Sequence, residues 1–161
     1  IKSAFLFSCY CGLRISDVLA LKWKNVDCTG EQWHINIIMQ KTQQPLYLPL
    51  SMQARKWMPE RDGSGEEEAV FSTLPCEDTC NVQIKQWVKE AGITKHVTYH
   101  VSRHTFATML LTLGADLYTV SKLLGHSQIK NTQVYAEIIN RRKVEAVNLA
   151  DNVFDTDDNL L

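Results

Sequence analysis

Six side chains of this sequence have the chemistry needed to act together on a phosphate ester. They are Arg14, Lys41, His100, Arg103, His126 and Tyr135. A phosphorus under attack gains negative charge on its non-bridging oxygens, and a planar guanidinium binds two such oxygens at once. A tyrosine supplies a nucleophilic oxygen, and positioning plus charge neutralisation supplies most of the catalysis. The set therefore predicts attack on a phosphodiester by a tyrosine, without a metal ion.

This chemistry needs a base for the phenol and an acid for the leaving group. A free phenol has a pKa of about 10, so ionising it at pH 7 costs roughly 4 kcal/mol. A neutral histidine can take the proton, and we expect His100 and His126 either to donate to the phosphate oxygens or to manage the proton of Tyr135. A 5′ alkoxide leaves as a strong base, and Lys41 is the candidate general acid.

The elements at the start of the chain place the first of these residues. Residues 1–11 are apolar and typical of a helix, and Ser16 is expected to cap a second short helix over residues 17–21. Arg14 lies between the two helices. Asp17 follows Arg14 by three residues, which is close enough on one helical face to orient the guanidinium.

A β-hairpin is predicted next. Residues 32–38 alternate with period two, and residues 45–50 form a second apolar, strand-like segment. Lys41 falls in the turn between them, on a hairpin that we expect to be mobile. A short helix over residues 52–58 should follow.

The rest of the chain is predicted to be helical, so the expected fold is mainly α with a small antiparallel β-hairpin, of the α+β class. The expected helices cover residues 78–91, 102–113, 117–124 and 131–149. After Tyr135, helical spacing produces an apolar stripe that docks on a neighbouring copy or folds back in cis: Ile138, Ile139, Val144, Val147 and Leu149. Residues 150–161 are acidic, and we expect a disordered tail.

Charge and composition limit the partners. The net charge is −1, yet residues 85–143 contain nine basic residues and three acidic ones. A segregated basic face suits double-stranded DNA, since counterion release depends on local charge. No apolar run is long enough to span a membrane and no leader is visible, so we expect a cytoplasmic protein. The five cysteines are expected to be reduced.

One metal-like spacing needs separate consideration. Cys76 and Cys80, followed by His96 and His100, have the pair spacing of a two-cysteine, two-histidine zinc site. The fifteen residues between the pairs are too many for the usual finger. We therefore expect neither a metal nor another cofactor.

These motifs resemble those of the tyrosine recombinases, also called phage-type integrases. The resemblance is carried by Gly12-Leu13-Arg14, Lys41, His100-Val101-Ser102-Arg103, Gly125-His126 and, nine residues later, Tyr135. Asp17 matches the usual acidic partner of the first arginine. The resemblance implies the catalytic-domain fold of that family over residues 1–149, with an upstream DNA-binding domain absent from this chain.

What the resemblance implies is site-specific DNA recombination by an enzyme that needs neither metal nor ATP. Tyr135 would cleave a strand and form a 3′-phosphotyrosyl intermediate, and a 5′-hydroxyl would reverse the reaction. Four copies would act on synapsed DNA, whereas we expect a monomer in isolation. His104 is interpreted as a structural histidine, because it is expected on a different helical face from His100.

Two other functions remain as alternatives. A type IB topoisomerase has a similar catalytic set but relaxes supercoiled DNA. A helix-turn-helix module that only binds DNA could use residues 117–124 and the helix from residue 131. That second reading leaves Arg14, Lys41 and His100 without a role.

Overall fold

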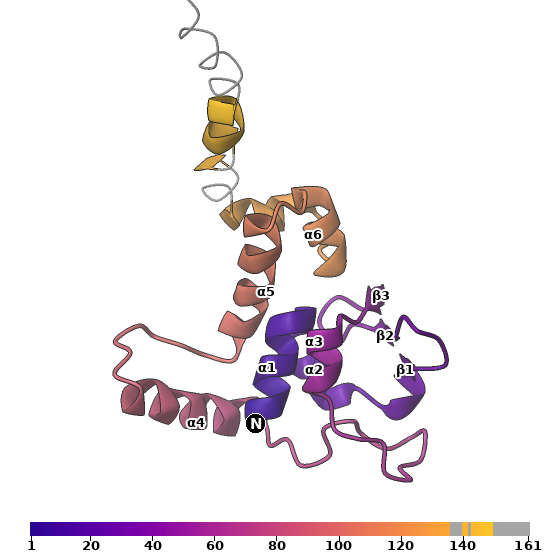
Figure 1. The fold of residues 1–161 in the computed structure, drawn as a ribbon. Helices are drawn as coiled ribbons and strands as arrows, with labels where there is room; N and C mark the ends of the chain where they lie inside the picture. Colours follow the sequence, from indigo (N-terminus) through magenta and orange to yellow (C-terminus); the bar gives the residue numbers. More distant parts are fainter. Residues whose placement is uncertain (136–139, 142, 150–161) are drawn as a thin grey trace, which may run out of the picture.

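The computed structural model describes residues 1–135, 140–141 and 143–149 (Figure 1). The elements are, in order, α1 (Lys2–Cys11), α2 (Ile15–Ala20), η1 (Trp23–Asn25), β1 (Val26–Asp27), β2 (His34–Ile38), β3 (Pro45–Pro49), α3 (Met52–Lys56), α4 (Glu77–Glu90), α5 (His100–Thr112), α6 (Leu117–Leu123) and η2 (Ile129–Tyr135). The fold is mainly helical with one small antiparallel sheet, which confirms the predicted class.

Helix α1 is the centre of the fold and packs against both α3 and α5 (Figure 1). Its buried residues are Ala4, Phe7, Ser8 and Cys11, at the spacing of one helical face. Gly12 ends the helix with φ of 74°, and its N–H donates to the Ser8 carbonyl at 2.9 Å. The chain therefore turns sharply just before Arg14.

The sheet has the order β1-β2-β3, and both pairings are antiparallel. Ile35 in the central strand pairs with Val26 on one side and with Leu48 on the other. Ile35 and Leu48 are buried, whereas Tyr47 between the inward positions of β3 is 60% exposed. The hairpin prediction is confirmed. Strand β1 was not predicted, because two residues are too short to show a period.

The turn of the hairpin carries Lys41, as predicted. The Met39 N–H donates to the Gln44 carbonyl, and the Gln43 N–H donates back to the Met39 carbonyl, each at 2.9 Å. Gln43 has φ of 53°, a left-handed conformation that suits a tight turn. Met39 is buried and Lys41 is exposed, so the turn is anchored at its base while the amine remains accessible.

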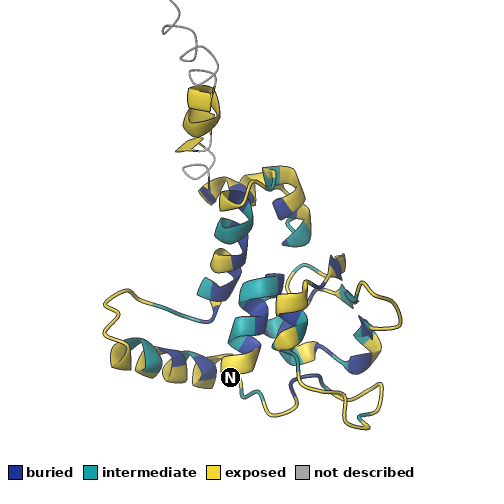
Figure 2. Cartoon of the chain, in the orientation of Figure 1, coloured by how far each residue is buried: buried dark blue, intermediate teal, exposed yellow. Residues whose placement is uncertain are grey.

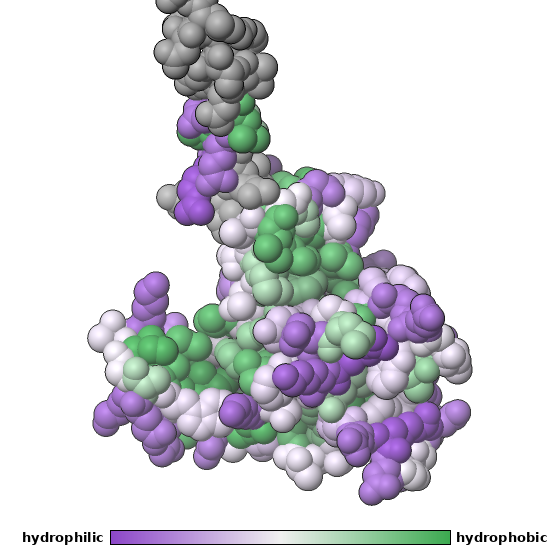
Figure 3. All heavy atoms as spheres, in the orientation of Figure 1, coloured by the Kyte–Doolittle hydropathy of each residue, from purple (hydrophilic) through white to green (hydrophobic). Residues whose placement is uncertain are grey.

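A second core lies between α5, α6 and η2, apart from the core around α1 and the sheet (Figure 2). Its buried members are Phe106, Ala107, Leu111, Val120, Leu124 and Tyr135. Apolar residues also gather at the surface over α6 (Figure 3). A third cluster joins α4 to the start of α5 through Ile84, Cys80 and Tyr99. Helix α5 thus takes part in two clusters, one with α4 at its N-terminal end and one with α6 and η2.

Two predicted helix starts are wrong. Helix α2 begins at Ile15, with Arg14 as its N-cap in an extended conformation, rather than with Ser16 as the cap. Helix α5 begins at His100, two residues earlier than predicted. In both cases the helix begins closer to a predicted catalytic residue, so Arg14 and His100 stand at helix N-termini.

The helix predicted from residue 131 is only partly described. Residues up to Tyr135 form the 3-10 helix η2, a tighter turn than the predicted α-helix. Residues 140–141 and 143–149 are helical. Ile138, Ile139 and the predicted tail 150–161 lie outside the described residues.

Among the described residues, no helix has both the length and the apolar character needed to cross a bilayer.

Gly12 is the position where we expect a single methyl group to cost most stability. A Cβ there would lie 2.5 Å from the ring of the buried Phe106, and the φ of 74° is already unfavourable for other residues. Gly63 has a similar φ of 68° with nothing within 4 Å, so it is the matched control. We expect Gly63→Ala to cost about 1 kcal/mol from the backbone alone. Gly12→Ala should cost about 1–3 kcal/mol more, measured by urea unfolding.

Equal losses at Gly12 and Gly63 would contradict the close contact between the end of α1 and α5.

Candidate active site

Four of the six predicted residues line one cavity of about 170 Å³: Arg14, Lys41, His100 and Arg103. They come from three separate elements, namely the N-terminus of α2, the turn between β2 and β3, and the first turn of α5. Glu77, at the start of α4, also lines the cavity. The fold therefore gathers two guanidiniums, an amine and an imidazole around a space that can take an anion.

Arg103 is the buried cation of this group, with only 3% of the residue exposed. Its Nη1 donates to the carbonyl of Gly12 at 2.7 Å, and its Nη2 donates to the carbonyl of Leu124. Gly12 ends α1 and Leu124 ends α6. Carbonyl groups at helix C-termini carry partial negative charge, so both contacts favour the cation. A guanidinium has five N–H groups, so donors remain for a ligand in the cavity.

The cations of the cavity repel one another. Burial and, to a smaller extent, the charge of Arg14 lower the pKa of Arg103 to about 10. Arg103 is still protonated at pH 7. A phosphate group bound in the cavity would relieve this repulsion, because its negative charge would face both guanidiniums.

Arg14 is held by two side chains that are themselves buried. Its Nη1 lies 4.0 Å from Oδ2 of Asp17 and donates to the sulfur of Met39 at 3.6 Å. Asp17 also accepts a hydrogen bond from the Gln40 N–H, at 2.7 Å, through its other oxygen. Asp17 was predicted to orient Arg14. It also connects the base of the Lys41 turn to helix α2, which follows Arg14.

Met39 extends this contact to the loop that carries His126. Gly125 has φ of 62°, and a Cβ there would lie 2.5 Å from both the sulfur and the terminal methyl of Met39. The sulfur of Met39 thus lies between Arg14 and the backbone of Gly125. Met39 was not predicted, because a buried methionine in a hairpin has no sequence signature of its own.

His126 lies outside the first cavity, against Met39 and Gly125 in a neighbouring cavity of about 380 Å³. Its Nδ1 and the buried Thr132 hydroxyl are 2.8 Å apart. Burial and, to a smaller extent, the charges of Arg103, Arg14 and His100 lower the pKa of His126 to about 4. The imidazole is therefore neutral at pH 7, with its orientation held by Thr132.

His100 is shifted in the same direction. Partial burial lowers its pKa, and the neighbouring His104, Arg103, Arg14 and Lys41 lower it further. Both predicted histidines are therefore neutral at pH 7 in the absence of a bound anion.

Tyr135 is buried at the end of η2, with 7% of the residue exposed. Burial raises the pKa of the phenol, and the charge of Arg103 opposes that rise. The phenol is within reach of the field of Arg103, although Tyr135 does not line the cavity of Arg14 and Lys41. Its hydroxyl lies 2.8 Å from Nδ1 of His104.

The expectation that His104 lies on a different helical face from His100 is wrong. Its ring lies edge-on to that of His100, with centroids 4.8 Å apart, and 5.8 Å from that of Tyr135. Residues four apart on a helix share a face, and this spacing was visible in the sequence. His104 therefore belongs to the same group as His100 and Tyr135.

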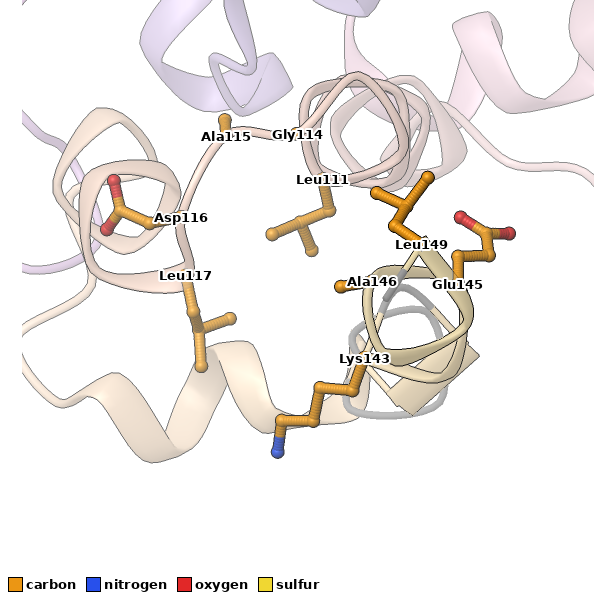
Figure 4. Close-up of a pocket in the computed structure, with 9 residues that line it drawn as sticks. All are labelled: Leu111, Gly114, Ala115, Asp116, Leu117, Lys143, Glu145, Ala146 and Leu149. Atoms are coloured by element: carbon orange, nitrogen blue, oxygen red, sulfur yellow. The ribbon is translucent and has the colours of Figure 1, made fainter. Parts of the chain in front are cut away.

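The helical segment 143–149 lies beside the junction of α5 and α6. A cavity of about 640 Å³ separates them, with the side chains of Leu111 and Leu117 on one side and Ala146 on the other (Figure 4). Val144 and Val147 of the predicted apolar stripe are exposed. The segment thus leaves an apolar space between itself and the body of the same chain.

The zinc spacing does not produce a site. Across the residues that the structure describes, no group of three or more His, Cys, Asp or Glu side chains could hold a metal ion. Cys80 is buried in the cluster between α4 and α5, whereas Cys76 is exposed at the start of α4.

Solved structures share this fold. The site-specific recombinase XerH, bound to a palindromic difH substrate in a post-cleavage complex, superposes with a TM-score of 0.67 at 18% identity, covering 93% of this chain and 45% of that one. The XerA recombinase superposes with a TM-score of 0.64 at 22% identity, covering 90% of this chain and 62% of that one.

Curated relatives match at higher identity. Tyrosine recombinase XerC of Escherichia coli O157:H7 is 35% identical over 137 residues, which are 79% of this chain and 45% of the relative. Tyrosine recombinase XerD of Lacticaseibacillus casei is 32% identical over 145 residues, 83% of this chain and 48% of the relative. The chain spans about half the length of the curated relatives it matches. The family model described as the phage integrase family matches residues 1–142, and the chain belongs to that family.

Proposed function

We propose that this chain is the catalytic part of a site-specific DNA recombinase, with residues 1–149 as the catalytic domain. The observation that supports this most is the single cavity lined by Arg14, Lys41, His100 and Arg103. Its cations suit one backbone phosphate of double-stranded DNA. The similarity to XerC and XerD recombinases supports the same function.

The reaction is a transesterification at phosphorus. Tyr135 attacks the phosphodiester and forms a 3′-phosphotyrosyl bond, and the 5′ oxygen leaves as a hydroxyl. Arg14 and Arg103 bind the non-bridging oxygens and stabilise the charge that develops on them. Lys41 supplies the proton to the 5′ oxygen. The energy of the broken bond is retained in the covalent link, so a 5′-hydroxyl from another strand can reverse the step.

The two neutral histidines serve the same phosphate. His100 lines the cavity and can donate to a phosphate oxygen. His126, held by Thr132 through Nδ1, can offer its other ring nitrogen as a donor. Asp17 acts on the site by orienting Arg14 and by holding the backbone beside Lys41. Strand exchange between two duplexes requires four such chains on synapsed DNA. In the absence of DNA, the chain is a monomer.

Covalent trapping tests the proposed function. We expect a suicide DNA substrate with a nicked strand to accumulate a protein–DNA adduct that survives denaturing electrophoresis. Tyr135→Phe should form none, because the ring remains but the nucleophilic oxygen is gone. Tyr47→Phe, at an exposed position on β3, is the matched control and should trap normally.

Binding of DNA without any adduct would favour a DNA-binding module instead. Relaxation of a supercoiled plasmid that has no specific site would favour a type IB topoisomerase.

Arg14 is the better arginine for a loss-of-function test. Arg103→Ala would also remove the bonds to Gly12 and Leu124, so instability would obscure its effect on catalysis. Arg14→Ala should slow adduct formation about 10²- to 10³-fold, the usual loss for one donor to a transition-state oxygen. DNA affinity, measured by fluorescence anisotropy, should change little. Arg55→Ala on α3 is the control; equal loss of affinity and rate in Arg14→Ala would contradict the assignment.

Changing the leaving group of the substrate separates proton donation by Lys41 from binding of the phosphate oxygens. Lys41→Ala should cleave ordinary DNA slowly, because the 5′ alkoxide no longer receives a proton. In a 5′-phosphorothiolate substrate the leaving atom is sulfur, which departs as a stable thiolate without a proton. This substrate should therefore restore the cleavage rate of Lys41→Ala. Arg14→Ala should show no such recovery, since its defect lies at the phosphate oxygens. Failure of the rescue would remove Lys41 as the acid.

A further inference from the structure

The phenol of Tyr135 is hydrogen-bonded to a histidine outside the predicted catalytic set. Nδ1 of His104 lies 2.8 Å from the Tyr135 hydroxyl oxygen, although the two residues are 31 positions apart and belong to α5 and η2. A nucleophile with a base at this distance is the arrangement that activates a weak hydroxyl. The inference that follows rests on the proposed function.

The surroundings of His104 hold its ring while leaving one edge open. The His100 ring packs edge-on against it, with centroids 4.8 Å apart, and the Tyr135 ring centroid is 5.8 Å away. Tyr135 is buried, whereas His104 as a residue is exposed. Burial raises the pKa of the Tyr135 phenol, so loss of its proton needs a base, and the positive charge of Arg103, on the same helix as His104, opposes that rise. A proton arriving on His104 can therefore pass to solvent, while the phenolate stays in a protected, cationic environment.

The other two histidines are less well placed for this task. His126 has Nδ1 engaged with the Thr132 hydroxyl, and His100 lines the cavity with the two arginines. Among the hydrogen bonds of the described residues, the phenol of Tyr135 is joined to His104 alone of the three.

We propose that His104 is the general base that accepts the phenolic proton of Tyr135 during attack. The O–H bond of Tyr135 breaks, and its proton goes to the lone pair on Nδ1 of a His104 ring protonated at Nε2. The electron pair left on the phenolic oxygen forms the bond to phosphorus. The bond from phosphorus to the 5′ oxygen breaks with its pair, and that oxygen takes a proton from Lys41. In rejoining, the 5′-hydroxyl attacks phosphorus and gives its proton to the Lys41 amine. The bond from phosphorus to the phenolic oxygen breaks with its pair, and that oxygen takes the proton back from the His104 imidazolium.

Two substitutions separate proton acceptance from positioning, each measured as the single-turnover rate of adduct formation on a suicide substrate in the full chain. His104→Ala should lower the rate by about 10²- to 10⁴-fold, the usual contribution of a general base. His104→Asn keeps a hydrogen-bonding group near the position of Nδ1 but cannot take a full proton, so it should remain slow. Exogenous imidazole should partly restore His104→Ala, because the position is open to solvent. His96→Asn, at an exposed loop residue, is the matched control.

The pH dependence gives a second readout that a structural role would not move. Without the base, hydroxide must remove the phenolic proton, so the rate of His104→Ala should rise by about tenfold per pH unit, more steeply than that of the unaltered chain. Circular dichroism and DNA affinity should be unchanged in both variants. Recovery of the rate by Asn would make His104 a positioning residue and overturn the proposal.

The failure of this inference is distinguishable from that of the proposed function. A wild-type rate in His104→Ala, with adducts that still depend on Tyr135, would overturn the role of His104 and leave the recombinase intact. Absence of an adduct in the unaltered chain would overturn both.

Discussion

The bridge that Arg103 makes between two helix ends is the interaction on which the site depends. One guanidinium donates to the carbonyl of Gly12, at the end of α1, and to that of Leu124, at the end of α6. The first helix belongs to the core with the sheet, and the second to the core with Tyr135. A buried cation requires such partners, because its desolvation is otherwise too costly. The two cores are thus fastened together at the point where phosphate would bind.

The same bridge also explains why the cavity keeps a positive charge. Bonds to carbonyl groups satisfy Arg103 without adding a formal negative charge, so its cation remains available to an anion. Asp17 is the buried carboxylate nearby, and it is shared between Arg14 and the backbone of Gln40. The cavity therefore keeps a positive balance while its two guanidiniums are held in place. Preorganised charge of this kind stabilises a transition state without reorganisation during the reaction.

The sequence predicted the residues of the site better than the contacts between them. Arg14, Lys41 and His100 could be found because ordered motifs with matching gaps carry strong information, and the hairpin followed from period two. Met39 and Thr132 could not be found, since each acts through a contact between segments distant in the sequence. The wrong cap at Ser16 has a simpler cause, because a local capping preference yields to packing. The error at His104 was avoidable, because residues four apart share a helical face.

The remaining question is how a site so rich in cations divides its acid and base work. Burial and, to a smaller extent, positive neighbours lower the pKa of His100 and of His126, so both are neutral at pH 7 and neither is a strong acid for the leaving group. The side chain of Lys41 is exposed, on a turn whose base is held by the backbone hydrogen bonds of Met39 with Gln43 and Gln44. The phenol of Tyr135 lies outside the cavity that Lys41 lines, within the field of Arg103 and next to His104. The proposed acid and the proposed base therefore lie at different places around Arg103, as a displacement with separate attacking and leaving oxygens requires.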